Sequence, residues 1–242
     1  VFCCINAPFG GPGYRVRSPE SVVAEIIHLH DEYGVEAFKI TDEMFVLKPS
    51  HYLPICEGLA GLSFADDLNI WAYARIDTVR PETLTTLRKA GIRWLALGIE
   101  SASNTVRDGA DKSFGDKDII QVVKSIQRAG IKVIGNFIFG LPEDTFGSMY
   151  DTLDLAFDLR CDFVNFYSAM AYPGSKLFTS AKPEDLPETW SGYSQHSHDC
   201  KPLPSKYLTS SEILHFRDYA HELYFHSDPV LAKRLKRKLN AA

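Results

Sequence analysis

The segment Ala129-Gly130-Ile131-Lys132-Val133-Ile134-Gly135-Asn136-Phe137-Ile138-Phe139 decides the fold class. An amphipathic stretch over residues 116–129 leads into it, and the apolar run 133–139 follows. Gly130 stands where the residue that ends a helix takes a positive φ, which glycine adopts without steric cost. A short apolar run that does not alternate strictly is typical of a strand buried on both faces. The segment therefore predicts a helix followed by a buried strand.

The same pattern recurs along the chain, and Gly34 and Gly91 separate a helical stretch from an apolar run in the same way. We expect strands at 37–40, 69–74, 94–99, 133–139 and 162–167, and helices over 19–33, 81–90, 116–129 and 143–159. Strands that alternate with helices predict right-handed crossovers and a parallel sheet. Because the chain opens on a helix, we expect one further strand upstream of Val1.

The alternating pattern ends at Tyr172-Pro173-Gly174. A segment rich in Pro, Ser and His then runs to about Leu208, and two polar-aromatic helices are expected over 210–226 and 228–239. No low-complexity linker divides the chain, which favours one catalytic unit with a C-terminal extension. We place the core at residues 1–178 and the extension, a loop with helices, at residues 179–242.

The composition is that of an ordinary globular protein, with 242 residues, 45% hydrophobic residues and a formal charge of -5. Five cysteines are too few for a disulfide framework, so we expect reduced thiols and a cytoplasmic location. The longest uninterrupted apolar run, Trp94 to Ile99, is far shorter than the roughly 18 residues of a membrane helix. The N-terminus lacks the layout of a signal peptide and is interpreted as a cut edge. The mild acidity argues against nonspecific binding of nucleic acid.

Polar residues follow every expected strand, at the carboxyl ends where parallel sheets bind ligands. They are Thr41-Asp42-Glu43, Arg75-Ile76-Asp77, Glu100-Ser101-Ala102-Ser103, Gly140-Leu141-Pro142-Glu143 and Ser168 to Tyr172. A single residue of this kind is more often a helix cap or an ion-pair partner, and Arg75 has Asp77 and Glu100 as alternative partners. The repetition after all five strands favours a ligand site at this edge.

Several of these segments, taken in order, resemble the radical S-adenosylmethionine superfamily. Val1-Phe2-Cys3 is similar to the end of its Cys-x3-Cys-x2-Cys loop, in which an aromatic residue precedes the third cysteine. The run from Gly135 to Glu143 is similar to its fifth-strand pattern at Ile138, Gly140 and Glu143. The match covers about residues 1–178 and looks most like members that carry a cobalamin-binding domain.

The resemblance implies an α/β fold, a partial (β/α)6 TIM-like barrel of parallel strands with a helical C-terminal extension. It also implies a set of site residues. Cys3 is expected to ligate a [4Fe-4S] cluster. Asp42 and Glu43 are expected to accept hydrogen bonds from the methionine ammonium, and Arg75 to bind a carboxylate. Glu100 and Ser101 are expected to reach the ribose hydroxyls or the carboxylate, and Ile138, Asn136 and Tyr167 to lie near the adenine.

The resemblance further implies reductive cleavage of S-adenosylmethionine to a 5′-deoxyadenosyl radical that takes hydrogen from a small-molecule substrate. A flavodoxin or ferredoxin is the expected electron donor, and a cobalamin held mainly by an upstream domain would serve methyl transfer. One alternative is a tRNA or protein methylthiotransferase. Alternatives of a different class are a noncatalytic scaffold and a barrel lyase. A Schiff-base aldolase would need a lysine at a strand end, and the strand ends given above have none.

The segment His196-Ser197-His198-Asp199-Cys200 carries two imidazoles and a thiol. A structural zinc site usually needs four ligands in paired spacings, which this segment lacks. We therefore expect a loop that folds over the barrel mouth and touches the substrate or an upstream domain. Cys4, Cys56 and Cys161 are interpreted as ordinary packing residues.

Overall fold

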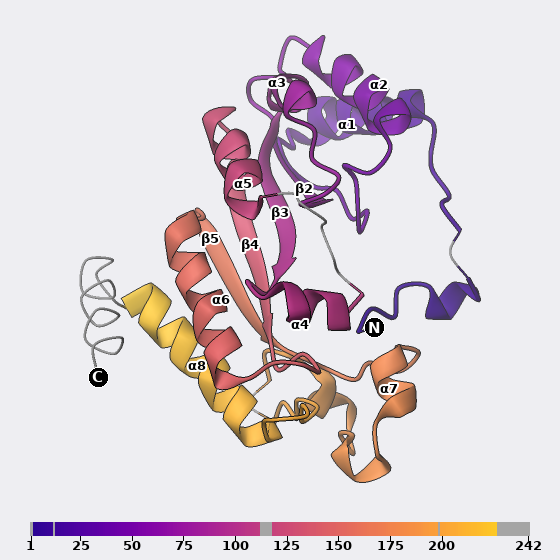
Figure 1. Cartoon of the computed structure of the whole chain (residues 1–242). Coiled ribbons are helices and arrows are strands. Elements are labelled where there is room, and N and C mark those ends of the chain that lie inside the picture. The colour runs from indigo at the N-terminus through magenta and orange to yellow at the C-terminus, as the bar shows by residue number, and fades with distance from the viewer. Residues whose placement is uncertain (1, 12, 112–117, 198, 227–242) are drawn as a thin grey trace.

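The computed structural model describes residues 2–11, 13–111, 118–197 and 199–226. Its strands are all parallel and form one sheet in sequence order. They are β1 (Ala37–Lys39), β2 (Asn69–Arg75), β3 (Ile92–Glu100), β4 (Lys132–Phe139) and β5 (Phe163–Ser168). The sheet curls into half a barrel (Figure 1). This confirms the predicted α/β partial barrel, whereas the strand expected upstream of Val1 lies outside the chain and stays a prediction.

The helices lie between and after the strands. They are α1 (Pro19–Tyr33), α2 (Pro49–Ala60), α3 (Leu84–Lys89), α4 (Asn104–Gly109), α5 (Ile119–Arg128), α6 (Phe146–Leu159), α7 (Lys176–Ser180) and α8 (Ser210–His226). Short 3-10 turns occupy η1 (Ala7–Phe9), η2 (Pro81–Thr83), η3 (Pro183–Asp185) and η4 (Trp190–Tyr193). The predicted helix over 228–239 lies outside the described residues. None of the described helices is long and apolar enough to cross a membrane.

The helix boundaries differ from the prediction for local reasons. The predicted helix over 81–90 divides into η2 and α3, and the one over 143–159 begins only at Phe146. Thr145 is the N-cap of α6 and exchanges hydrogen bonds with Ser148, which leaves Pro142 to Asp144 in a turn. The sequence analysis missed α2, α4 and α7.

The glycines at the helix ends behave as predicted. Gly34, Gly91 and Gly130 have φ values of 65°, 86° and 76°. Gly34 ends α1, and its N–H donates to His30 O at 2.8 Å. These left-handed residues let each helix stop and the chain turn directly into the next strand.

The two faces of the sheet differ in burial, as β2 shows. Ile70, Ala72 and Ala74 are buried in the core beneath the helices, whereas Trp71 and Tyr73 are half-buried on the opposite face. We call this opposite face the inner face of the sheet. Strand register places Gly98, Asn136, Ile138, Asn165 and Tyr167 on it as well.

Candidate functional site

The N-terminal arm, residues 2–11, lies at the carboxyl ends of β4 and β5. Phe2 packs with Tyr167 against an apolar cluster that includes Ile138, Leu141 and Ala169. Figure 1 shows this end of the chain beside α4 and α7. Further along the arm, Ala7 approaches the turn after β5 so closely that a Cβ on Gly174 would lie 2.4 Å from the Ala7 Cβ. The arm therefore brings Cys3 to the edge where ligands of parallel sheets bind.

The cysteines fall into two groups. Cys3 is exposed, whereas Cys56 and Cys161 are buried in the core. Burial, assisted by the neighbouring Glu57 and Asp162 carboxylates, raises the pKa of both buried thiols to about 12, so they stay protonated. The thiolate is the form that ligates iron, and the exposed Cys3 fits that role.

Cys3 does not suffice for a cluster. Among residues 2–11, 13–111, 118–197 and 199–226, the structure brings no three His, Cys, Asp or Glu residues together to hold a metal ion. A [4Fe-4S] cluster with one open iron needs three thiolates.

Glu100 is the strained residue of the inner face. The register between β3 and β4 shifts at Gly98 and Glu100, and Glu100 has a φ of 66°, which a residue with a side chain adopts only at a cost in energy. A Cβ on Gly98 would lie 2.8 Å from Glu100 Oε1, so the missing side chain leaves the space that the carboxylate fills. Strain of this kind clusters at ligand sites, and it fits the predicted role of Glu100.

Tyr167 and Glu100 share one region. Burial, the nearby Tyr73 and the Glu100 carboxylate together raise the pKa of Tyr167. The sequence analysis named Tyr167 and Glu100 but missed Tyr73. The spacing of two residues between Tyr73 and Arg75 is the signal that places both on one face of a strand.

Arg75 already has a partner in this structure. Its guanidinium donates to Asp77 through Nε at 2.9 Å and through Nη2 at 2.8 Å. The ion pair that the sequence left open as an alternative is therefore present. A ligand carboxylate would have to share or displace Asp77, and the predicted contact of Arg75 stays a prediction.

Ser101 lies inside the molecule. It is fully buried, and its hydroxyl forms a 3.1 Å hydrogen bond with Thr152 on α6. The Arg107 guanidinium donates to the Ser101 carbonyl oxygen. These contacts tie the end of β3 to α6 and α4, so the predicted ribose contact would require a rearrangement.

Two asparagines link three strands on the inner face. Asn136 on β4 donates to Leu97 O at 3.2 Å and accepts from Asn165 Nδ2 at 2.9 Å. The sequence analysis named Asn136 and missed Asn165, which is paired with it in register. The hydrogen bond between the two side-chain amides therefore joins β4 and β5 on the inner face.

Asp42 and Glu43 lie in the exposed loop after β1. Asp42 lines a cavity of about 380 Å³ together with Arg15 and Arg17 of the segment before α1. Burial and the Asp42 carboxylate raise the pKa of Tyr14. The structure thus brings Asp42 to the chain that follows the arm, at the opposite edge of the sheet from Tyr167.

Asp144 was missed and organises the turn after β4. It is 1% exposed and accepts hydrogen bonds from the N–H groups of Gly140 and Leu141, both at 3.0 Å, and from Ser148 Oγ at 2.6 Å. Burial outweighs these bonds and raises the pKa of Asp144 to about 6. An Asp directly before a Thr-x-x-Ser helix start is the signal that could have identified it.

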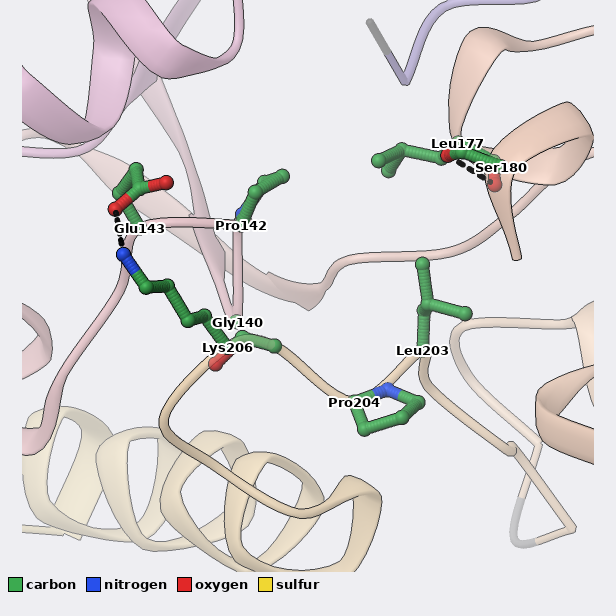
Figure 2. A pocket seen from close by; sticks show the side chains of 9 residues that line it. Gly140, Pro142, Glu143, Leu177, Ser180, Leu203, Pro204 and Lys206 are labelled. Atoms are coloured by element: carbon green, nitrogen blue, oxygen red, sulfur yellow. Dashed lines mark hydrogen bonds and ion pairs between the residues drawn. The ribbon is translucent and has the colours of Figure 1, made fainter. Parts of the chain in front are cut away.

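The turn that Asp144 holds borders a small cavity of about 210 Å³ (Figure 2). Pro142 and Leu203 line it from opposite sides, and Glu143 and Lys206 form a 3.8 Å ion pair at its edge. The 203–206 segment of the extension therefore packs directly on the loop after β4.

The family model described as the Radical SAM superfamily matches residues 1–156. The chain belongs to this superfamily. It is 28% identical over 240 residues to an uncharacterized methyltransferase of Pyrococcus horikoshii, covering 96% of this chain and 50% of that protein. It is 28% identical over 203 residues to the anaerobic magnesium-protoporphyrin IX monomethyl ester cyclase of Cereibacter sphaeroides, covering 83% of this chain and 33% of that one.

A solved structure supports the fold. The radical S-adenosylmethionine methyltransferase TsrM from Kitasatospora setae, with cobalamin and a [4Fe-4S] cluster bound, superposes with a TM-score of 0.61 at 20% identity. The superposition covers 66% of this chain and 33% of TsrM. The chain spans half the length or less of these relatives.

Proposed function

We propose that the protein is a radical S-adenosylmethionine enzyme that methylates a small-molecule substrate and uses cobalamin as a second cofactor. The packing of Phe2 with Tyr167 against Ile138 carries the proposal, because it brings the exposed thiol of the next residue, Cys3, to the polar ends of the strands. The methyltransferase names of the Pyrococcus horikoshii relative and of TsrM support methyl transfer. The methylthiotransferase alternative has weaker support from the relatives.

When bound, a reduced [4Fe-4S] cluster and S-adenosylmethionine would supply one-electron cleavage of a sulfonium carbon–sulfur bond. This cleavage yields a radical that can take a hydrogen atom from the substrate. In this proposal Cys3 ligates iron and Glu100 accepts hydrogen bonds from the methionine or ribose part. The apolar wall of Phe2, Ile138 and Ala169 shields the nucleoside from water. A flavodoxin or ferredoxin is the proposed electron donor, and the cobalamin would be held by residues outside this chain.

The test uses the full-length protein, reconstituted anaerobically with iron and sulfide. We expect about four iron atoms per protein. Cys3→Ala should lose most of this iron, whereas Cys4→Ala, a change of the same kind at the next residue, should retain it. Equal iron in the two variants would contradict the ligand assignment.

The same preparation tests the activity. With a reductant and S-adenosylmethionine labelled in its methyl group, we expect 5′-deoxyadenosine or S-adenosylhomocysteine to form, and the label to reach a substrate only when cobalamin is supplied. Neither product from a fully reconstituted protein would favour the noncatalytic scaffold. Transfer of the label together with sulfur would favour the methylthiotransferase.

A further inference from the structure

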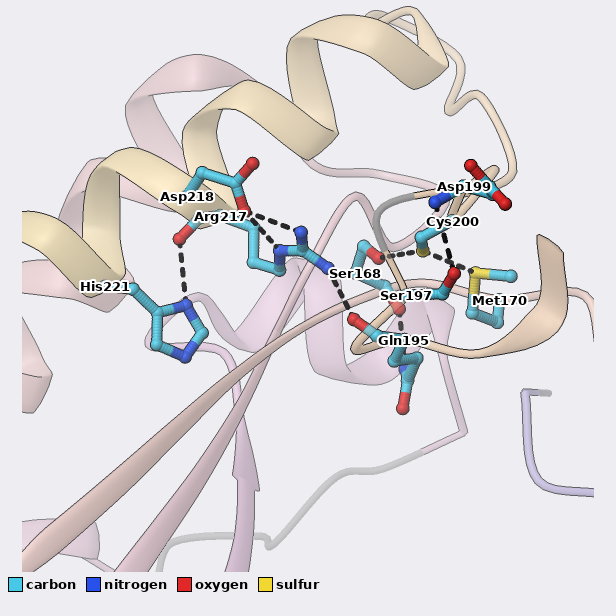
Figure 3. Close-up of polar contacts among 9 residues, drawn as sticks. All are labelled: Ser168, Met170, Gln195, Ser197, Asp199, Cys200, Arg217, Asp218 and His221. Atoms are coloured by element: carbon cyan, nitrogen blue, oxygen red, sulfur yellow. Dashed lines mark hydrogen bonds and ion pairs between the residues drawn. The ribbon is translucent and has the colours of Figure 1, made fainter. Parts of the chain in front are cut away.

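Residues 194–197 and 199–200 of the extension lie against the carboxyl end of β5. Gln195 Nε2 donates to the Ser168 carbonyl oxygen at 2.7 Å. At the other end of the segment, the buried Cys200 thiol lies 3.6 Å from Ser168 Oγ and 3.8 Å from Met170 Sδ (Figure 3). The segment is thus attached to the last residues of β5 on both sides of His196.

A buried arginine fixes the same segment from outside. Arg217 on α8 donates through Nη1 to the carbonyl oxygen of Gln195, the residue before His196. Its Nε and Nη2 donate to Asp218 Oδ1 at 2.9 and 2.6 Å (Figure 3). The Arg217 side chain is only 11% exposed, and burying a guanidinium is costly unless it is paired. A buried, positively charged side chain therefore holds the backbone of the residue next to His196.

His196 itself is exposed, and its ring meets the Tyr167 ring edge to face at 5.4 Å. Within the described ranges 2–11, 13–111, 118–197 and 199–226, its ring nitrogens form no hydrogen bond. Tyr167 is paired in register with Ile138, and both contact the cluster on which Phe2 packs. A fixed segment thus presents an exposed imidazole over Tyr167, which packs on the same cluster as Phe2 of the arm.

We propose that His196 contacts the nucleoside of S-adenosylmethionine and that Arg217 is the positioning residue for this contact. The inference rests on the proposed function. A nucleoside has a flat base and a rim of hydrogen-bonding atoms. Tyr167 and Ile138 offer apolar surface to the base, and the imidazole nitrogens of His196 offer the hydrogen bond. The C-terminal extension thereby completes a site whose other residues come from the strand ends.

The first experiment measures the affinity of the full-length, cluster-loaded protein for S-adenosylhomocysteine by calorimetry. His196→Phe keeps a ring against Tyr167 but removes both nitrogens, and we expect it to weaken binding about 3- to 10-fold. His196→Gln keeps a hydrogen-bonding group and should lose less than His196→Phe. His215→Phe, at an exposed position on α8, is the matched control and should bind like the wild type.

A chemical footprint supplies a readout besides binding. Diethyl pyrocarbonate modifies exposed imidazoles, and mass spectrometry reports the rate at each histidine. S-adenosylhomocysteine should slow modification of His196 and leave that of His215 unchanged. Unchanged affinity in His196→Phe together with an unprotected His196 would overturn the inference. Failure of the wild type to bind S-adenosylhomocysteine would instead overturn the proposed function on which it rests.

The positioning role is tested with a pair of arginines. Arg93 donates to the carbonyl oxygens of Arg88 at 2.7 Å and Asp66 at 2.9 Å, near the start of β3, and its side chain is 16% exposed. Arg217→Leu and Arg93→Leu should both lower the melting temperature, but only Arg217→Leu should weaken S-adenosylhomocysteine binding and reduce the protection of His196. Arg217→Lys should restore part of both. Equal binding in the two leucine variants would show that Arg217 acts on stability alone.

Discussion

The two ends of the parallel strands are built differently. At the carboxyl ends, Glu100, Ser101, Asp144 and Ser168 are all buried polar residues. Bonds to backbone N–H groups and to neighbouring hydroxyls satisfy Ser101 and Asp144. A buried polar group without such partners costs free energy, so each of these groups requires a specific arrangement of its surroundings.

At the amino ends, aromatic rings and lysines line the inner face. Lys39 Nζ lies 4.3 Å from the Trp71 ring centroid, and Lys132 Nζ lies 4.7 Å from that of Trp94. A cavity of about 420 Å³ opens between these rings and Phe163. The buried Trp71 Nε1 has no hydrogen-bond partner among the residues that the structure describes. The buried Ser101 and Asp144 side chains at the carboxyl ends are thus hydrogen-bonded, whereas the buried Trp71 Nε1 toward the amino ends is not, among the described residues.

The two ends of β3 illustrate this difference, because a glycine at one end borders the core and a glycine at the other borders a proposed ligand contact. Gly91 immediately precedes β3 at its amino end, and Gly98 lies near its carboxyl end. At Gly91 the neighbour of an added Cβ is the buried core residue Leu68, whereas at Gly98 it is the carboxylate of Glu100. We therefore expect a change at Gly91 to affect folding, and a change at Gly98 to affect mainly the ligand.

The largest expected effect is that of Gly91→Ala on stability. Gly91 has a φ of 86°, and an added Cβ would lie 2.4 Å from the Leu68 Cβ. Left-handed strain and overpacking together should lower the free energy of unfolding by about 3 kcal/mol. Gly34→Ala is the control, because its φ is 65° but nothing lies within 4 Å, so it should cost about 1 kcal/mol. Equal losses in urea denaturation would show that the contact with Leu68 is unimportant.

Asp144→Ala should have the next largest effect, at about 2 kcal/mol, because the N–H groups of Gly140 and Leu141 lose their acceptor. Asp144→Asn keeps an acceptor oxygen and should lose less. The pH dependence has a definite sign. The folded pKa of about 6 lies above the ordinary value of about 3.9, so the folded state binds the proton more tightly.

The contribution of Asp144 to stability is therefore greatest below about pH 4 and falls as the pH rises to about 6. Asp144→Asn has no proton to lose and should flatten this part of the profile of unfolding free energy against pH. A wild type and an Asp144→Asn variant with parallel profiles between pH 4 and 6 would show that the carboxyl is not buried in solution.

The contrast between the two ends also explains what the sequence could predict. The five parallel strands follow from apolar runs and glycines, which are local signals, whereas the partial barrel was implied by the family resemblance. The helix α2 was missed because Pro54 lies inside it, although Tyr52, Ile55, Cys56 and Leu59 give it a buried face. Packing against α1 and α3, which no local pattern contains, stabilises it.

The site was predicted less completely than the fold. Charged residues after strands were found by their position, and Asp77, two residues from Arg75, was named as one of its alternative partners. Partners far away in the sequence were not found: the Ser101–Thr152 bond depends on which side chains turn toward each other in space. Arg217 and Gln195 are 22 residues apart, and no local sequence pattern around either residue indicates their contact. Long-range polar partners are the part of a site that a single sequence does not specify.

Gly98→Ala should have a smaller effect on folding than Gly91→Ala and a clear effect on the ligand. The added Cβ would lie 2.8 Å from Glu100 Oε1, the end of a side chain that can rotate away. We expect a stability loss below about 1 kcal/mol and a 3- to 10-fold weaker affinity of the cluster-loaded protein for S-adenosylhomocysteine. Glu100→Gln should weaken binding similarly. Full affinity in both variants would remove Glu100 from the proposed ligand contacts.

The smallest expected effect is that of Lys39→Met at the amino end. Methionine retains most of the apolar stem and removes the charge over the Trp71 ring, so the loss should be about 0.5 to 1 kcal/mol. Lys182→Met, at an exposed lysine before η3, is the control and should change the free energy of unfolding by less. Lys39 ends the short strand β1 but is in register with Trp71, near the amino end of β2. Neither lysine is among the proposed ligand contacts, so ligand affinity should be unchanged in both variants. A weaker affinity for S-adenosylhomocysteine in Lys39→Met alone would mean that the amino ends of the strands also take part in binding. The expectation that the ligand contacts only the carboxyl ends would then be wrong.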